Sequence, residues 1–145
     1  MTNKLTESAI RVYLMDRKEL NPLLRSVRFS TEDINSAVEM TVSYYNSVPP
    51  FVDYQTSNSF PWTWLLLTGV SGHLLKSASI NEASNELNYE ASGVSIQDKN
   101  KASIFSQIGG QLWEEFKAKV LDIKMSINIG SCFSSSPSEL AYLAR

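Results

Sequence analysis

A run of apolar residues at positions 60–67 opens the segment around which the other predicted elements are arranged. Beyond it, apolar side chains recur at every fourth position, namely Leu66, Val70, Leu74 and Ala78. Small residues stand between them and let a neighbouring backbone come close: Gly69, Ser71, Gly72 and Ser79. This period predicts one long central helix. Pro61 is expected to be its first residue, since the N–H that proline lacks has no partner in a first turn.

Two helices are predicted ahead of the central one. The first covers about residues 5–17 and ends before Asn21–Pro22, because a residue before proline is pushed out of the α region. The second begins after Ser30, whose side chain can cap the helix, and it ends at residues 48–50, which include two prolines. Phe29 precedes this cap and is placed to pack on the first turns.

A last long helix is predicted over about residues 99–125, with Asp98 as its N-cap. Its apolar stripe repeats every three or four residues and is the natural partner of the central helix: Ala102, Phe105, Ile108, Leu112, Phe116, Val120 and Ile123. Gly109–Gly110 would permit a close crossing at some cost in helix stability. Between the two long helices, Ser92–Gly93 has turn chemistry and alternating apolar residues follow, which predicts a small β-hairpin.

The chain changes character after residue 126. Residues 125–138 carry no charge, serine is frequent, and neither a helical nor a strand period is present. The predicted fold is therefore mainly α: a four-helix domain (1–126) with a small β-hairpin between its last two long helices, and an extended C-terminal tail (127–145). Apolar tail residues need a buried place, in the domain's own core or on a neighbouring subunit. The candidate anchors are Phe133, Pro137, Leu140, Tyr142 and Leu143.

Composition narrows the functional classes. The 145 residues suit one domain, and 13 basic against 15 acidic residues give a net charge of −2, without the broad positive surface of a nucleic-acid binder. Charged residues make up 19%, below the usual quarter or so, which suits extensive packing against other protein. The single cysteine, Cys132, excludes an intrachain disulfide.

The apolar run of the central segment raises the question of a membrane span. Its densely apolar part covers about half of the roughly 20 residues that a bilayer requires, so burial against other helices is expected. No apolar run follows the first residues, so no secretory signal peptide is expected either.

No catalytic motif is present, such as a phosphate-binding glycine loop or a nucleophile elbow. His73 is expected to be a satisfied or interfacial imidazole, and a pair with Cys132 is disfavoured because no third group orients it. Trp62 and Trp64 are expected to anchor a core or interface. The lysines of the last helix, Lys124 included, alternate with acidic residues and predict a solvated face. No catalytic, cofactor or metal site is therefore predicted.

Three stretches, in this order and spacing, carry a resemblance: residues 10–16 continuing to 21–24, residues 28–34 through 45–50, and residues 85–89 with Gly93 and Asp98–Lys99. Together they resemble a family of small virion proteins of tailed bacteriophages, the helical head-to-tail adaptor or neck proteins. The similarity spans about residues 10–129.

The resemblance implies a structural protein, not an enzyme, in the virion neck and made in the host cytoplasm. Its subunits are expected to form a homo-oligomeric, dodecameric ring that contacts the portal protein and tail or neck proteins. Viral DNA would pass through the ring without sequence-specific binding, and the tail would hold the portal or a neighbouring subunit. Two other classes stay open: another virion component, such as a tail-completion or baseplate protein, and a small helical enzyme or nucleic-acid-binding regulator.

Overall fold

The computed structural model describes residues 5–21, 25–51, 54–84, 88–91, 94–97 and 100–134, and these are mainly helical. Four α-helices account for most of them: α1 (Glu7–Tyr13), α2 (Thr31–Ser47), α3 (Thr63–Ser84) and α4 (Lys101–Ser134). A 3-10 turn, η1 (Lys18–Leu20), follows α1, and two short strands, β1 (Asn88–Ala91) and β2 (Val94–Gln97), stand between α3 and α4. The predicted mainly α class with four helices is confirmed.

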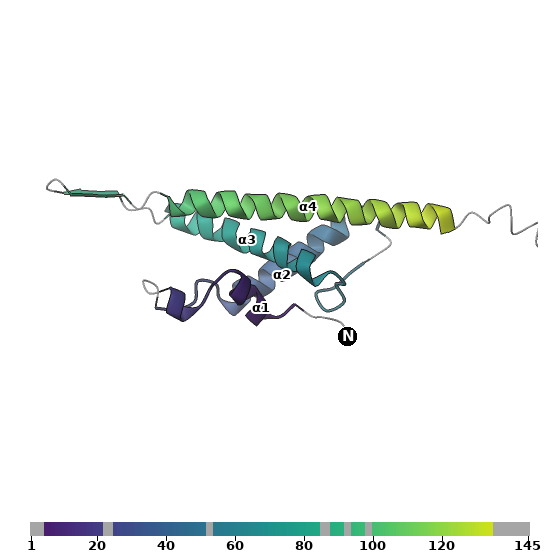
Figure 1. Cartoon of the computed structure of the whole chain (residues 1–145), viewed down its shortest axis with the longest axis horizontal. Coiled ribbons are helices and arrows are strands. Elements are labelled where there is room, and N and C mark those ends of the chain that lie inside the picture. The colour runs from purple at the N-terminus through teal and green to yellow at the C-terminus, as the bar shows by residue number, and fades with distance from the viewer. Residues whose placement is uncertain are drawn as a thin grey trace, which may run out of the picture.

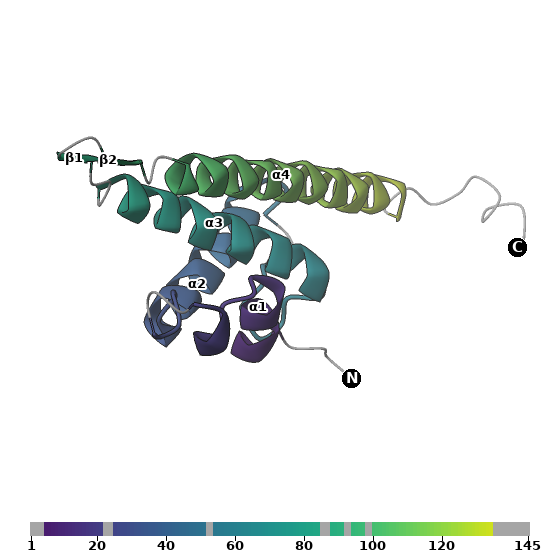
Figure 2. The same ribbon diagram turned by 60° about the vertical axis from the view of Figure 1, so that its left-hand side comes forward.

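The two longest helices, α3 and α4, lie side by side and antiparallel (Figure 1). Helix α2 crosses α3 at an angle and its last turns reach α4, where Tyr44 packs on Trp113, while α1 lies near the start of α3 (Figure 2). Strands β1 and β2 pair antiparallel, with Asn88 opposite Gln97. Helices α1 and α4 lie on opposite sides of the central helix.

The core is built around the first half of α3. Every residue from 65 to 72 is buried, and Leu74 and Ala78 continue the buried face. A helix that is apolar on all sides must be covered on all sides, and its neighbours supply that cover. The buried side chains that pack on α3 come from the other three helices and from the loop before α3: Ile10, Ile34, Ala37, Val42, Tyr45, Phe60, Phe116 and Val120.

Close approach of α3 and α4 depends on two glycines. A methyl group at Gly72 would lie 3.0 Å from the backbone nitrogen of Trp113 and 3.2 Å from the carbonyl oxygen of Gly109. A methyl group at Gly109 would lie 3.0 Å from the backbone nitrogen of Lys76. Backbone atoms cannot yield as a flexible side chain can. The close crossing expected from Gly72 and Gly109 is thus confirmed.

Local sequence signals set the start of α2. The Ser30 hydroxyl accepts a hydrogen bond from the Asp33 backbone N–H at 3.0 Å, and the Asp33 carboxylate accepts one from the Ser30 N–H at 2.9 Å. This reciprocal capping box confirms the predicted N-cap. Phe29, directly before the cap, is buried as expected.

Helix α1 ends at Tyr13, four residues earlier than predicted, because Asp16 draws the chain into a turn. Met15 adopts a left-handed conformation with φ of 54°, and the Asp16 side chain is buried. Its carboxylate accepts hydrogen bonds from the backbone N–H groups of Arg28 (2.6 Å) and Phe29 (3.1 Å). The side chains of Asn21 (2.9 Å) and Arg11 (3.0 Å) also donate to it. Tertiary hydrogen bonds therefore outweigh the helical periodicity here.

The two long helices start later than predicted. The Leu66 N–H bonds to the Trp62 carbonyl, so Trp62 occupies the N-cap position of α3 and Pro61 lies outside the helix. Packing of the Trp62 ring, whose centroid is 5.9 Å from that of Tyr45, fixes this start. At the start of α4 the Ile104 N–H bonds to the Asn100 carbonyl. The predicted cap Asp98 lies outside the described residues.

Helix α4 continues to Ser134, so the prediction of an extended tail from residue 127 is wrong for residues 127–134. Serine, asparagine and isoleucine cost a helix only a few tenths of a kcal/mol each, and no proline interrupts the chain before Pro137. Ile127 is also partly buried beside Trp62, and this burial stabilises the additional turns of α4. The rest of the predicted tail lies outside the described residues.

Gly109→Ala is expected to destabilise the protein by about 1–3 kcal/mol, because the added methyl group meets the backbone of α3. Gly110→Ala is the matched control, since a methyl group there meets no described atom within 4 Å. Gly110→Ala should stabilise the protein by about 0.5–1 kcal/mol, because alanine has a higher helix propensity than glycine. Urea unfolding followed by circular dichroism measures both, and equal effects of the two substitutions would contradict the close crossing.

Asp16→Ala should lower the free energy of unfolding by roughly 3 kcal/mol, since it leaves the backbone N–H groups of Arg28 and Phe29 without their acceptor and removes one of the acceptors of the Arg11 guanidinium. Glu19→Ala, at an exposed position nearby, should change it by less than about 0.5 kcal/mol. Thermal and urea unfolding of the two variants provide the test. A loss at Asp16 no larger than at Glu19 would show that the buried carboxylate does not hold the turn.

Candidate functional site

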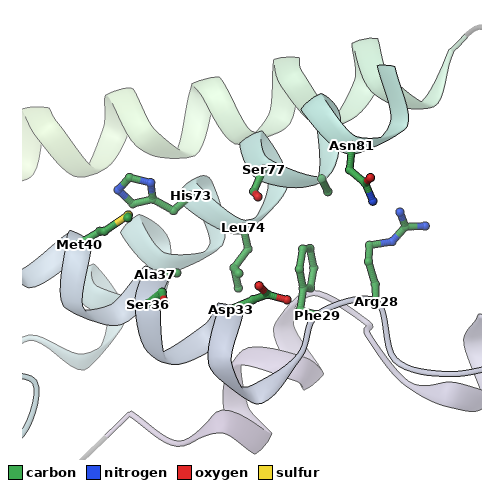
Figure 3. Close-up of a pocket in the computed structure, with 11 residues that line it drawn as sticks. Arg28, Phe29, Asp33, Ser36, Ala37, Met40, His73, Leu74, Ser77 and Asn81 are labelled. Carbon is green, nitrogen blue, oxygen red and sulfur yellow. The ribbon is translucent and has the colours of Figure 1, made fainter. Parts of the chain in front are cut away.

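A pocket of about 390 Å³ lies between α2 and α3, and His73 stands at one end of it (Figure 3). In this view His73 lies near Met40, whereas Arg28 and Asn81 lie at the opposite end. The imidazole also packs against the ring of Trp113 on α4, with 4.3 Å between ring centroids. Burial disfavours the imidazolium, and the nearby positive charge of Lys76 acts in the same direction, so both lower the pKa of His73.

The charged groups of this pocket are already engaged in structural interactions. The Asp33 carboxylate accepts hydrogen bonds from the hydroxyl and from the backbone N–H of Ser30. Both bonds stabilise the ionised carboxylate and lower the pKa of Asp33, and the bond from the hydroxyl has the larger effect. Arg28 forms an ion pair with Glu82 and lies 4.9 Å from the centroid of the Phe105 ring. The pocket therefore holds a histidine packed on Trp113 and two ions that are engaged within the subunit, and two serines, Ser36 and Ser77, also line it.

The structure does not bring His73 and Cys132 together. His73 contacts Trp113, and Cys132 follows Trp113 on the same helix by about 28 Å of axial rise. No group of three His, Cys, Asp or Glu side chains among the described residues is arranged to hold a metal ion. None of the helices in the described part combines the length and hydropathy that spanning a bilayer requires.

Lys124 was expected on a solvated face, and this expectation is wrong. Its side chain is 1% exposed, and its ammonium donates to the Pro50 carbonyl at 3.3 Å and lies 4.0 Å from the centroid of the Tyr45 ring. The four-residue spacing from Phe116 and Val120 could have revealed this position, because it continues the buried stripe of α4. The carbonyl and the aromatic face offset part of the desolvation of the charge. Lys124 is thus a structural residue that joins α4 to the end of α2.

Exposed apolar side chains on α4 form a surface that the sequence analysis missed. Leu121, Met125 and Ile129 follow one another at a spacing of four and are 46%, 61% and 57% exposed. We call these three residues the α4 ridge. Ile108, which was expected in the buried stripe, is exposed as well. A second four-residue period, offset from the core stripe, is the sequence signal that marks the ridge.

A second apolar surface lies at the start of the chain. Tyr13 on α1 and Trp64 on α3 meet edge to face, with 5.7 Å between ring centroids, and both are exposed. We call this pair of aromatic residues the N-terminal patch. The expectation that Trp62 and Trp64 anchor a core or an interface is confirmed for Trp62, which packs on the core. Trp64 is exposed, so an interface role for it stays a prediction.

The predicted tail anchors fall almost entirely beyond the described residues. Phe133 lies on the last turn of α4, and its side chain is not among those described. Pro137, Leu140, Tyr142 and Leu143 lie outside the described part of the chain. Their role as anchors therefore stays a prediction.

Comparison of the chain with models of protein families, with characterised proteins and with solved structures finds no match.

A titration of His73 tests the account of the pocket. The chain holds one histidine, so a single imidazole signal in an NMR titration reports its pKa, which should lie below the usual value of about 6.5. Lys76→Gln should raise this pKa, whereas Lys18→Gln, on η1, should not.

The sign of the pH effect follows from the lowered pKa. Folding favours the neutral imidazole, so its contribution to stability is complete above the unfolded pKa and is lost as the pH falls through the folded pKa. His73→Gln should flatten stability against pH in that window. A folded pKa at or above the usual value would contradict the burial of His73 against Trp113.

Proposed function

We propose that this chain is a structural virion protein of a tailed phage, not an enzyme, and that it forms the head-to-tail adaptor ring in the neck. The ring, dodecameric in this proposal, joins the portal to the tail and neck proteins around the channel for viral DNA. It needs no cofactor. The proposal includes the small hairpin of β1 and β2 and the role of the tail anchors. It also includes assembly after synthesis in the host cytoplasm.

One observation supports it most. The α4 ridge and the N-terminal patch consist of different residues, and the helices α4 and α1, which carry the ridge and Tyr13, lie on opposite sides of α3. A closed ring of identical subunits uses heterologous contacts, in which each subunit offers two different faces to its two neighbours. Exposed apolar side chains gathered on a surface mark contact with other protein. Two different apolar surfaces suit a subunit with a neighbour on each side.

The charge of the chain suits the channel. DNA that slides through a ring must not be held by its phosphates, and lysine and arginine are the side chains that hold them. The net charge is −2, and Arg11, Arg28 and Lys117 are engaged with Glu7, Glu82 and Glu114 within the subunit. These charges support passage of DNA without sequence-specific binding.

Mixing two assembly variants tests the heterologous contact. The ridge variant carries Leu121→Asp and Met125→Asp, and the patch variant carries Tyr13→Asp and Trp64→Asp. Each should be folded and monomeric in native mass spectrometry under conditions in which the wild-type chain forms closed rings. A mixture should give a pair of one ridge variant with one patch variant and nothing larger, because each subunit keeps one intact face.

Asn128→Asp, at an exposed polar position of α4, is the control and should leave ring formation unchanged. Rings that form equally well from the ridge variant would contradict the proposed contact. So would a wild-type chain that forms only a symmetric dimer, because its contact would join two copies of one face.

A further inference from the structure

An apolar groove lies where α4 passes the start of α3. It has a volume of about 370 Å³ and is lined by Trp62, Asp122, Ile123, Ser126 and Ile127. We call it the Trp62 groove. Trp62 and Ile123 are partly buried and pack on the hydrophobic core, so the floor of the groove is continuous with the core. Asp122 is the one charged residue among those that line it.

The groove lies close to the end of α4. Ile127 precedes Ser134 by about 10 Å along the helix axis, and Ile123 by about 16 Å. Residues 135–140 can span up to roughly 20 Å when extended, which covers either distance even after the chain reverses its direction. A segment tethered this closely has an effective concentration in the millimolar range at the groove. Residues just beyond α4 can therefore reach the groove of their own subunit.

The residues beyond α4 include side chains that suit an apolar groove with one carboxylate. Leu140, Tyr142 and Leu143 are large and apolar, and Arg145 follows them with a positive charge. The groove offers Trp62 and two isoleucines as an apolar surface, with the Asp122 carboxylate beside them. Apolar side chains gain about 25 cal/mol for each Å² of surface that they bury. The apolar side chains of residues 138–145 thus match the apolar lining of the groove, and Arg145 is the charge opposite to that of Asp122.

We propose that the Trp62 groove binds residues 138–145 of its own chain, with Leu140 and Leu143 on Trp62 and Ile127 and with Arg145 facing Asp122. This inference goes beyond the adaptor function and does not rest on it. If the same anchors also hold a partner, the groove competes with that partner. Docking then requires release of the segment, and the apparent affinity for the partner falls by the fraction of subunits in the released state.

Disulfide trapping tests the contact in the full chain. In a Cys132→Ser background, Ser126→Cys places a thiol in the groove and Ala141→Cys places one between the anchors. The matched control replaces Ser126→Cys with Asn128→Cys, which lies at nearly the same height on α4 but about 160° around its axis. In oxidised glutathione the groove pair should close within one chain at least about tenfold faster than the control pair.

Leu140→Ser with Leu143→Ser, added to the groove pair, should lower the closing rate to that of the control. Equal rates for the groove and control pairs would overturn the proposal, and so would a rate that these substitutions leave unchanged. Disulfide-linked dimers in place of closed monomers would overturn it as well, since the groove would then hold the segment of a second copy. The trap uses neither the α4 ridge nor the N-terminal patch, so failure of ring assembly would not affect it.

Discussion

The backbones of α3 and α4 come into contact at Gly72 and Gly109, and this contact positions the other helices of the domain. It brings the two helices together without side chains between them at that point. At Gly69 a methyl group would lie 2.5 Å from Thr41 of α2 and 2.8 Å from the Phe116 ring, so one small residue admits side chains from both neighbouring helices. The small positions of α3 thus set how closely the domain packs, and the long α4 is held rigidly enough to present a surface.

The polar interactions in the domain serve the fold. Asp16 holds the turn after α1, the Ser30 and Asp33 pair caps α2, and Lys124 joins α4 to the residues that follow α2. Each of these groups has partners within the subunit, which is the ordinary use of buried charge in proteins. Among the exposed described residues, the large apolar side chains of the α4 ridge and the N-terminal patch stand out. Such surfaces are the part of the domain that suits contact with other protein.

Features with local causes could be predicted from the sequence. The Ser30 cap depends only on residues three positions apart, and the central helix depends only on its own apolar run. Both features could therefore be predicted. The end of α1 depends on Arg28 and Phe29, which lie more than ten residues away from Asp16, and no helical period carries that information. The charge of Lys124 predicts a solvated side chain, whereas its place in the buried stripe of α4 predicts burial. The length of α4 was underestimated because the gain from packing Ile127 beside Trp62 is tertiary.

The surfaces of the candidate site could be predicted from the sequence only in part, for a different reason. The tail anchors were chosen because apolar residues in a segment without periodicity need a burial place, and that argument cannot say which surface receives them. The α4 ridge was hidden because its four-residue period shares a helix with the stronger period of the core. Only the packing of α4 on α3 separates the two, since it shows which of the two stripes is covered.

The proposed adaptor ring can be tested by cryo-electron microscopy of phage particles from the source of this chain. We predict a ring of this protein between the portal and the tail, with the α4 ridge of each subunit on the N-terminal patch of the next. Density for the chain at another place in the particle, or particles that lack it altogether, would contradict the adaptor function.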